Sequence, residues 1–245
     1  MKKILIAIVI QLLVISTISA EMTKMNKEAY MAVKKKADSG DANSQFALGG
    51  LYYHGILSSK NHAKAAQMYK KAVEQGHVKA MFNLGTMYEN GDGVEKSYKK
   101  AISLFTTAAK AGDIKSVLHL AEIFDNKKLL VHDYEKAFHW YKKAADSGYP
   151  IAQHKVGMMY KDGRGTKIDL RKAVRYLTKS AMQSWGDAQY DLGVMYLNGD
   201  GVPEDLEEAE TLLNNAYING KLEAKLILDK YQWEIKSRGL TLPEE

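Results

Sequence analysis

A glycine returns every 36 residues in this chain, and that period constrains the fold more than any other feature of the sequence. One register of the period holds Gly40, Gly76, Gly112, Gly148 and Gly220. Ser184 takes the remaining position of that register. Repeats of about 20 to 50 residues are typical of solenoids, in which each unit buries its apolar face only against its neighbours. We therefore expect a stack of repeated units in place of one central core.

Each unit contains the pattern of two helices. In the second unit the first helical face, which we expect in the core, is formed by Ala80, Leu84, Gly85 and Tyr88. The Gly91–Gly93 turn ends this helix, because glycine adopts the left-handed conformation that often follows a helix. A second face follows at Ala101, Phe105, Ala108 and Ala109. The sequence thus predicts five helix-turn-helix units, at residues 41–76, 77–112, 113–148, 149–184 and 185–220.

Two further columns of the repeat have a physical role. The start of every second helix carries a possible capping residue: Asn61, Ser97, Asp133, Asp169 and Asp205. Side chains of these types accept a hydrogen bond from the free amides of a first helical turn. Every first helix carries a small residue, at Gly49, Gly85, Ala121, Gly157 and Gly193. We expect neighbouring helices to approach each other closely at these small residues.

Both ends of the chain differ from the repeats. Residues 1–20 begin with Lys2 and Lys3, continue with an apolar stretch and end in small residues, which is the pattern of a secretory signal peptide cut after Ala20. An uncleaved anchor is the alternative, but the apolar stretch is shorter than the ~20 residues that span a membrane. We therefore expect no stable membrane insertion after cleavage. Residues 21–40 are expected to form a leader and a capping helix, and residues 221–245 a second capping helix and a tail.

The columns resemble the Sel1-like repeat family, a relative of the tetratricopeptide repeat. The resemblance is carried by Ala80, Leu84-Gly85, Tyr88, Gly91, Gly93-Val94, Lys100-Ala101, Ala108-Ala109 and Gly112. It implies a right-handed α/α solenoid with a curved inner face, and it covers residues 41–220. Exported bacterial members of the family are implied to be adaptors, regulators, host-interaction factors or immunity proteins. The third unit departs from the pattern, with Ala121 in place of glycine and residues 126–129 in place of the glycine turn.

The residue types needed for catalysis or cofactor binding are not arranged for either role. The chain has no cysteine, and its seven histidines lie in different columns without a metal-binding spacing. The Asn90–Gly93 and Asn198–Gly201 turns lack the other ligands of a calcium loop and the Lys-Ser/Thr of a phosphate loop. We therefore expect no enzyme activity, no cofactor and no metal. The net charge of +6 is dispersed along an exported chain, so we also expect no nucleic-acid partner.

The candidate binding residues occupy first-helix positions that face the inner side of related solenoids. They are Phe46, Tyr53, Phe82, Glu89, Lys115, Glu122, His154, Met158, Lys161, Tyr190 and Leu197. Their chemistry changes from unit to unit, as in a groove shaped for one partner, although drift would give the same variation. Aromatic side chains among them are the expected anchors of a protein interface.

The expected function is the binding of a protein partner by a monomeric, periplasmic or secreted protein. Within this class the leading hypothesis is an immunity protein that neutralises a secreted antibacterial effector, such as a lipase. An envelope regulator or adaptor and a host-interaction factor are the alternatives. From another class come a peptidoglycan-binding module, in which Tyr149 and Trp185 stack on sugar rings, and a hydrolase.

Overall fold

The structure is a computed structural model that describes residues 27–56 and 59–237, with side chains described up to residue 231. The predicted signal peptide at residues 1–20, the start of the leader and the tail beyond residue 237 lie outside the described residues. Every regular element among the described residues is a helix, and the predicted all-α solenoid is confirmed. A helix over residues 27–38 comes first. It is followed by α2 (Ala42–His54), α3 (His62–Glu74), α4 (Val78–Asn90), α5 (Tyr98–Lys110), α6 (Ile114–Asp125), α7 (Tyr134–Asp146), α8 (Pro150–Asp162), α9 (Leu170–Ala181), α10 (Gly186–Asn198), α11 (Leu206–Ile218) and α12 (Glu223–Ser237).

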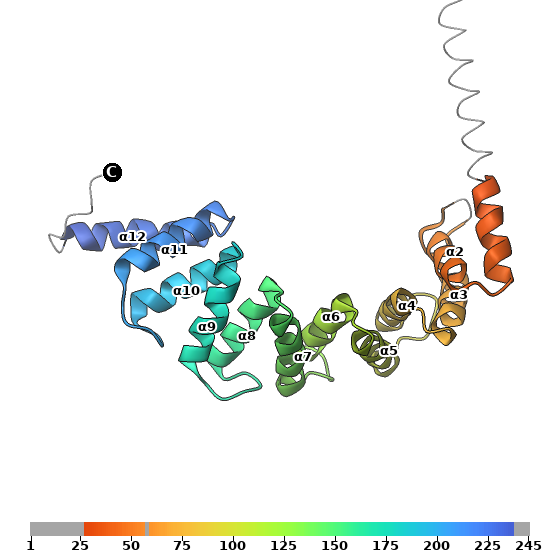
Figure 1. The fold of residues 1–245 in the computed structure, drawn as a ribbon, viewed down its shortest axis with the longest axis horizontal. Coiled ribbons are helices and arrows are strands. Elements are labelled where there is room, and N and C mark those ends of the chain that lie inside the picture. Colours follow the sequence, from red (N-terminus) through yellow and green to blue (C-terminus); the bar gives the residue numbers. More distant parts are fainter. Residues whose placement is uncertain (1–26, 57–58, 238–245) are drawn as a thin grey trace, which may run out of the picture. The chain divides into compact units, whose positions relative to one another are not determined.

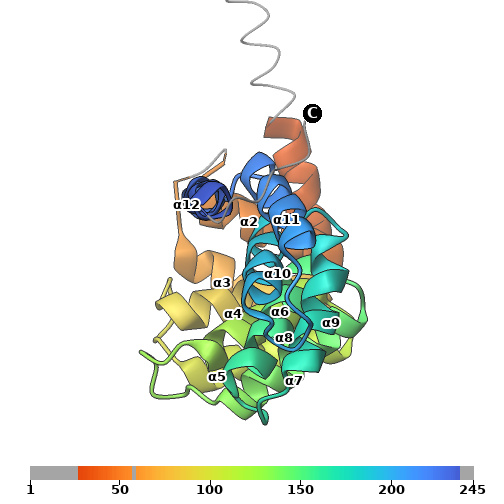
Figure 2. The same cartoon turned by 90° about the vertical axis from the view of Figure 1, so that its left-hand side faces the viewer.

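The chain divides into two compact units, each larger than a single repeat, which are described separately (Figure 1). Unit 1 ends at Ser116 and contains α2 to α5, and unit 2 begins at Val117 and contains α7 to α12. In unit 1, α2 packs on α3 and α4 packs on α5. In unit 2, α8 packs on α9 and α10 packs on α11. Figures 1 and 2 both show α4 beside α5 and α10 beside α11. Each unit is thus a stack of helix pairs.

The glycines of the small-residue column lie where the two helices of a pair approach each other closely, as the sequence predicted. A Cβ atom added to Gly85 would lie 2.6 Å from Cε1 of Phe105 on the facing helix, and Phe105 is fully buried. A Cβ atom on Gly49 would lie 2.7 Å from the ring of Tyr69. Both distances are shorter than real contacts of such an atom. The absence of a side chain on the first helix therefore lets a large ring of the second helix enter the core.

The predicted caps of the second helices are all present. In each case the side chain accepts a hydrogen bond from the main-chain amide three residues later, at Asn61, Ser97, Asp133, Asp169 and Asp205. The turn that ends each repeat has a positive φ angle, between 80° and 101° where a glycine stands. Ser184 adopts the same conformation, with φ 61°, and is the one residue other than glycine with positive φ in the described part of the chain. A serine there bears a steric cost that glycine avoids.

A column of lysines covers a column of aromatic rings. The ammonium group lies 5.2–5.6 Å from the ring centre in the pairs Lys64–Tyr52, Lys100–Tyr88, Lys136–Phe124 and Lys172–Tyr160. Such a position favours attraction between the cation and the ring face. The prediction that Tyr88 is a core residue is wrong, because its ring is half-buried and lies beneath Lys100 and Lys70. The predicted core residue Leu84 is buried.

A pair of side-chain amides joins two helices in three of the repeats. The first-helix members are buried glutamines, Gln45, Gln153 and Gln189. Their Oε1 atoms accept a hydrogen bond of 2.8–2.9 Å from the side-chain amide 30 residues later, on Gln75, Gln183 and Asn219. Their Nε2 atoms donate to a main-chain oxygen eight residues earlier. The second repeat has Met81 and Ala111 at these positions, and the third has Val117 and Ser147.

The last helix, α12, follows the residue pattern of the first helices, but two of its positions carry different residue types. Its apolar members Ala224 and Leu228 are buried against α11. Lys225 takes the position that Gln189 has in α10, and Asp229 takes the position of Gly193. The two charged side chains form an ion pair, and each is about half exposed. The amide and the glycine that join helices in the repeats are therefore replaced by charges on α12.

Candidate protein-binding surface

Three predicted anchor residues lie in unit 1, on α2 and α4, each of which is the first helix of its repeat. Phe46, Tyr53 and Phe82 are each half-buried, so part of every ring is accessible. The ring of Phe46 stacks on His77, with centroids 4.6 Å apart, and the ring of Tyr53 stacks on His62 at 4.7 Å. These neighbours hold the rings in place, which lowers the entropic cost of binding a partner.

Two adjoining hollows open between these rings. The first, the Tyr53 hollow, has a volume of about 220 Å³ and is lined by Tyr53, His54, Tyr69, Phe82, Asn83, Thr86 and Met87. The second, the Lys115 hollow, has a volume of about 250 Å³ and is lined by Phe46, Lys79, Phe82, Asn83, Asp113 and Lys115. Phe82 and Asn83 line both hollows. We call the two hollows together the aromatic face of unit 1.

Some polar groups of the aromatic face already have hydrogen-bond partners among the described residues, and others have none. Asn83 Nδ2 donates to the Tyr69 hydroxyl at 3.1 Å, and burial raises the pKa of Tyr69. The Asp113 carboxylate accepts from the main-chain nitrogen of Ser116 at 2.8 Å and from its Oγ at 2.6 Å. Lys79 and Lys115, in contrast, are exposed and form no ion pair with any described residue. The face therefore offers apolar surface together with two unpaired positive charges.

Tyr53 also has a structural role, a hydrogen bond to a turn, that its position in the sequence did not predict. Its hydroxyl donates to Oδ2 of Asp92, in the turn after α4, at 2.9 Å. Burial, followed by the nearby Asp92 carboxylate, raises the pKa of Tyr53. In unit 2 the same 39-residue spacing joins Asp125 to Arg164, whose Nη1 donates to Oδ1 at 3.2 Å. Residues at this position thus tie one repeat to the turn of the next.

Three candidate residues of unit 2, His154, Tyr190 and Leu197, make contacts within the protein. His154 Nε2 lies 2.6 Å from Oδ2 of Asp191. Tyr190 lies beneath the Lys221 ammonium group, at 5.4 Å, and packs with Leu197 against the core of α11 and α12. Glu122 is exposed, and His119, whose Nδ1 lies 3.7 Å from Glu122 Oε2, lowers its pKa. The three remaining candidates on the two units are half-buried: Glu89, Met158 and Lys161.

Residues that the sequence analysis did not select complete the aromatic face. Asn83 lines both hollows, and Asp113 lines one of them. Asp113 occupies the position just before a first helix, as do His77 in unit 1 and Trp185 in unit 2. The 36-residue period places this position next to the anchors: His77 contacts Phe46, and Asp113 shares a hollow with Phe82. The period was therefore a usable signal for these residues.

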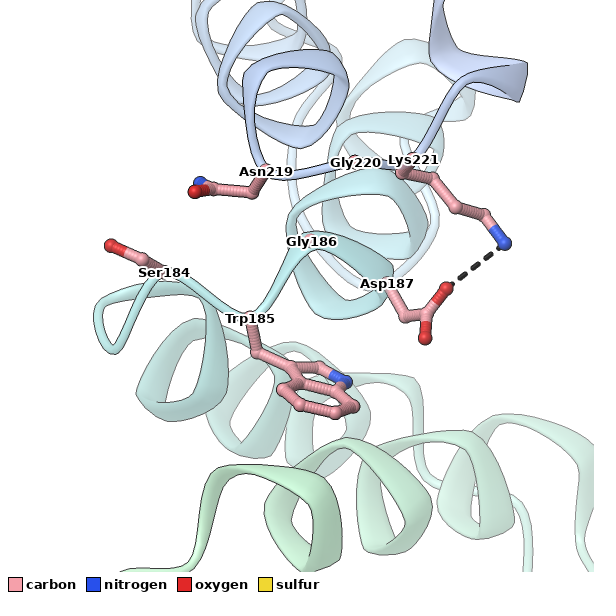
Figure 3. A pocket seen from close by; sticks show the side chains of 7 residues that line it. All are labelled: Ser184, Trp185, Gly186, Asp187, Asn219, Gly220 and Lys221. Atoms are coloured by element: carbon pink, nitrogen blue, oxygen red, sulfur yellow. Dashed lines mark ion pairs between the residues drawn. The ribbon is translucent and has the colours of Figure 1, made fainter. Parts of the chain in front are cut away.

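The turn around Trp185 forms a hollow of about 300 Å³ in unit 2, lined by Ser184, Trp185, Gly186, Asp187, Asn219, Gly220 and Lys221 (Figure 3). Its charged groups neutralise each other, because Lys221 Nζ lies 2.9 Å from Asp187 Oδ1. Figure 3 shows the Trp185 ring and the Asn219 side chain extending in different directions. The indole nitrogen of Trp185 is buried and has no hydrogen-bond partner among the described residues. Tyr149, at the equivalent position of the preceding repeat, is 38% exposed.

No cluster of three or more His, Asp or Glu side chains within the described residues could hold a metal ion. No helix within them combines the length and the apolar character needed to cross a membrane.

Solved structures with the same fold come from several bacteria. A Sel1 repeat protein from Oxalobacter formigenes is 28% identical, with a TM-score of 0.76 over 84% of this chain. A protective antigen of uropathogenic Escherichia coli with an SLR fold is 26% identical, with a TM-score of 0.68 over 88% of this chain. This chain spans 60% and 53% of the length of those two proteins. An immunity protein from Pseudomonas aeruginosa is 16% identical, and the match covers 78% of this chain and 73% of that protein. Its TM-score is 0.41, so this likeness is too distant to inform function.

The family model of the Sel1 repeat matches five stretches of the chain: residues 42–77, 78–113, 128–149, 150–185 and 186–221. The third match omits residues 114–127, where the sequence departs from the glycine pattern. No curated protein matches the chain. Sel1 repeats are typically protein-interaction modules without catalytic activity. Because the five matches cover more than half of its residues, the chain belongs to the Sel1 repeat family.

Proposed function

We propose that this protein binds a protein partner through the aromatic face of unit 1, without catalysing a reaction. The observation that carries the proposal is the pair of adjoining hollows around Phe82, with half-buried rings beside two unpaired lysines. Aromatic anchors in partly enclosed sites supply most of the energy of many protein interfaces. We also propose that the candidate residues of unit 2 contact a protein partner.

A blocking substitution tests this proposal without removing a packing residue. Thr86 lines the Tyr53 hollow, and its Oγ1 donates to the main-chain oxygen four residues earlier. Thr86→Arg should fill the hollow and weaken binding of the partner about thirtyfold, because a hot-spot contact contributes about 2 kcal/mol or more. Thr107→Arg is the matched control, since Thr107 is exposed on α5 and makes the same local hydrogen bond.

The partner is first captured from envelope extracts, or supplied as the product of an adjacent gene, and is then purified for titration calorimetry. Circular dichroism establishes that both variants fold. A folded Thr86→Arg variant that binds the purified partner as tightly as the Thr107→Arg control would exclude the aromatic face as the binding surface.

We also propose that the protein acts outside the cytoplasm, after cleavage behind Ala20. The signal-peptide pattern of residues 1–20 supports this, and the likeness to a protective antigen is in keeping with export. The intact mass of protein recovered from the periplasm and the medium tests the cleavage. A chain that still begins at Met1 and stays in the membrane fraction would contradict it.

Within this role, neutralisation of a secreted effector is the specific activity that we propose. It is supported by the signal-peptide pattern of residues 1–20 together with the five repeats, which suit a protein that binds another one. Bacteria that direct the effector-like product of a neighbouring gene to the periplasm should stop growing. Co-expression of the repeat protein in these cells should restore their growth. Continued toxicity despite normal levels of the repeat protein would favour an envelope adaptor or a host-interaction factor.

A further inference from the structure

The charges of the Lys115 hollow point to the chemistry of the partner. Lys79 and Lys115 are 36 residues apart and line the same hollow. Many other lysines of the chain are engaged, such as Lys64 and Lys100 over aromatic rings and Lys34 with Asp38. Lys79 and Lys115 have no such contact within the described residues. Two lysines left unpaired in one hollow favour an anionic group as the ligand.

The carboxylate already present in the hollow does not satisfy these lysines. Asp113 accepts two hydrogen bonds from Ser116, which orient it toward the start of α6. Even with Asp113 ionised, the hollow keeps a net charge of one positive unit. The Trp185 hollow of unit 2 differs, because Lys221 is paired there with Asp187 at 2.9 Å and lies 3.7 Å from Glu223. The excess of positive charge is thus a property of the Lys115 hollow.

The adjoining hollow has the opposite character. Tyr53, Tyr69, Phe82 and Met87 give the Tyr53 hollow a largely apolar lining. Asp92 accepts a hydrogen bond from the Tyr53 hydroxyl at 2.9 Å, so its carboxylate would repel an acidic group placed beside Tyr53. A ligand that spans both hollows therefore has its apolar part near Tyr53 and its negative part near Lys115.

Asn83 lies between the two hollows and can hold a peptide backbone. Its Nδ2 atom donates one hydrogen bond, to Tyr69, which leaves a second amide hydrogen and Oδ1 without a partner among the described residues. One donor and one acceptor in this position match the C=O and N–H groups of an extended chain. A side chain of this kind favours a peptide over a simple anion.

We propose, building on the function proposed above, that the partner inserts a segment in which an acidic residue lies close to a large apolar residue. The apolar side chain enters the Tyr53 hollow, and the carboxylate lies between Lys79 and Lys115. Asn83 bonds to the backbone between them. A nucleic acid would satisfy the lysines alone, but it has no group that suits the apolar hollow.

Fluorescein-labelled peptides test this directly on the full chain. Each ten-residue peptide carries one leucine or phenylalanine in a glycine–serine background and, one to four positions away, a glutamate, a glutamine or a lysine. Fluorescence anisotropy should show the best glutamate peptide binding about tenfold tighter than its glutamine counterpart, with the lysine peptide weakest. The preference should shrink as salt is raised, because these lysines are exposed.

Variants assign the preference to the two lysines. Lys79→Gln/Lys115→Gln should abolish the difference between glutamate and glutamine peptides. The control Lys99→Gln/Lys110→Gln removes the same charge from exposed positions of α5 and should keep the difference. A preference that survives in the Lys79/Lys115 variant overturns the proposal, as does the absence of binding by every peptide at millimolar concentration.

The remaining outcomes separate this proposal from the broader one. If glutamate and glutamine peptides bind equally and Thr86→Arg abolishes both, the aromatic face binds peptides but the acidic preference is wrong. If Thr86→Arg leaves peptide binding unchanged, the aromatic face itself is excluded. Displacement of the glutamate peptide by oligothymidylate as effectively as by unlabelled peptide would favour nucleic acid and overturn the proposal.

Discussion

The buried amide pair of the fourth repeat makes a quantitative prediction. In Gln183→Ala, the Gln153 side chain, which is 5% exposed, keeps an amide oxygen whose donor at 2.8 Å has been removed. A buried acceptor without a partner costs about 1–3 kcal/mol. In Gln153→Met, the amide left behind is that of Gln183, which is exposed, so water replaces its partner. We expect this second variant to lose less than about 1 kcal/mol.

The double variant should be more stable than Gln183→Ala alone. It recreates the natural pair of the second repeat, Met81 and Ala111, and replaces both partners by apolar groups, which is nearly neutral. Ala145 O, which loses the Gln153 amide, still accepts from the Gly148 amide at 3.0 Å. The main-chain oxygens of Gly148 and Lys179 lose the Gln183 amide, but both residues are exposed, so water replaces that donor. The two substitutions are therefore expected to be coupled by about 1–2 kcal/mol.

Urea and thermal unfolding of the four proteins, followed by circular dichroism, measure this cycle. A loss of 1 kcal/mol corresponds to a fall in Tm of about 2–4 °C for a chain of this length. The fourth repeat can unfold apart from the others, so the slope of the urea transition must be the same in all four proteins. Losses that simply add in the double variant would refute the reasoning, since they would show that the amides act independently.

Three further predictions concern the turns, the packing and the caps. Ser184→Gly should raise the stability by about 0.5–1 kcal/mol, because it relieves a positive φ angle, and Gly148→Ser should lower it; thermal melts compare them. Gly85→Leu should overpack the contact between α4 and α5 and cost at least about 1–3 kcal/mol, and a melt equal to that of the natural protein would contradict the contact. Hydrogen bonds to the caps lower the pKa of Asp133 and Asp169, so their contribution to stability is present above the usual aspartate range and is lost as the pH falls through it. Acid unfolding should therefore depend less steeply on pH in the double asparagine variant, and an unchanged acid transition would show that these caps do not contribute.

The parts of the fold that recur in every repeat could be predicted from the sequence. The caps at Asp133 and Asp169 and the contact at Gly85 each occupy a column of five positions, and the physical role of a capping residue or a missing side chain depends on local geometry alone. Five occurrences of residues with the same physical property leave little room for another interpretation. The period therefore predicted the caps, the glycine turns and the close contacts between paired helices.

Features that join different columns escaped the sequence analysis. The bond between Tyr53 and Asp92 spans 39 residues and ends in a turn, where the repeat pattern is weakest. The glutamine pairs span 30 residues and are absent from two repeats, so they form no complete column. In the candidate site, Tyr53 and Phe82 could be selected by position, but the hollows depend on side-chain orientation. That Lys79 and Lys115 are unpaired follows only from the positions of all their neighbours.

The charges on α12 decide how this molecule can associate with copies of itself. The chain starts its described part with a helix that matches a second-helix pattern and ends with α12, which matches a first-helix pattern, so two copies could in principle complete one repeat end to end. Contacts of this head-to-tail type do not close and lead to filaments. A helix docking on α12 in the manner of the repeats would have to bury Lys225 and Asp229, and it would meet the aspartate where α10 has Gly193. Desolvating this ion pair opposes the contact, so we expect the charges of α12 to disfavour head-to-tail association.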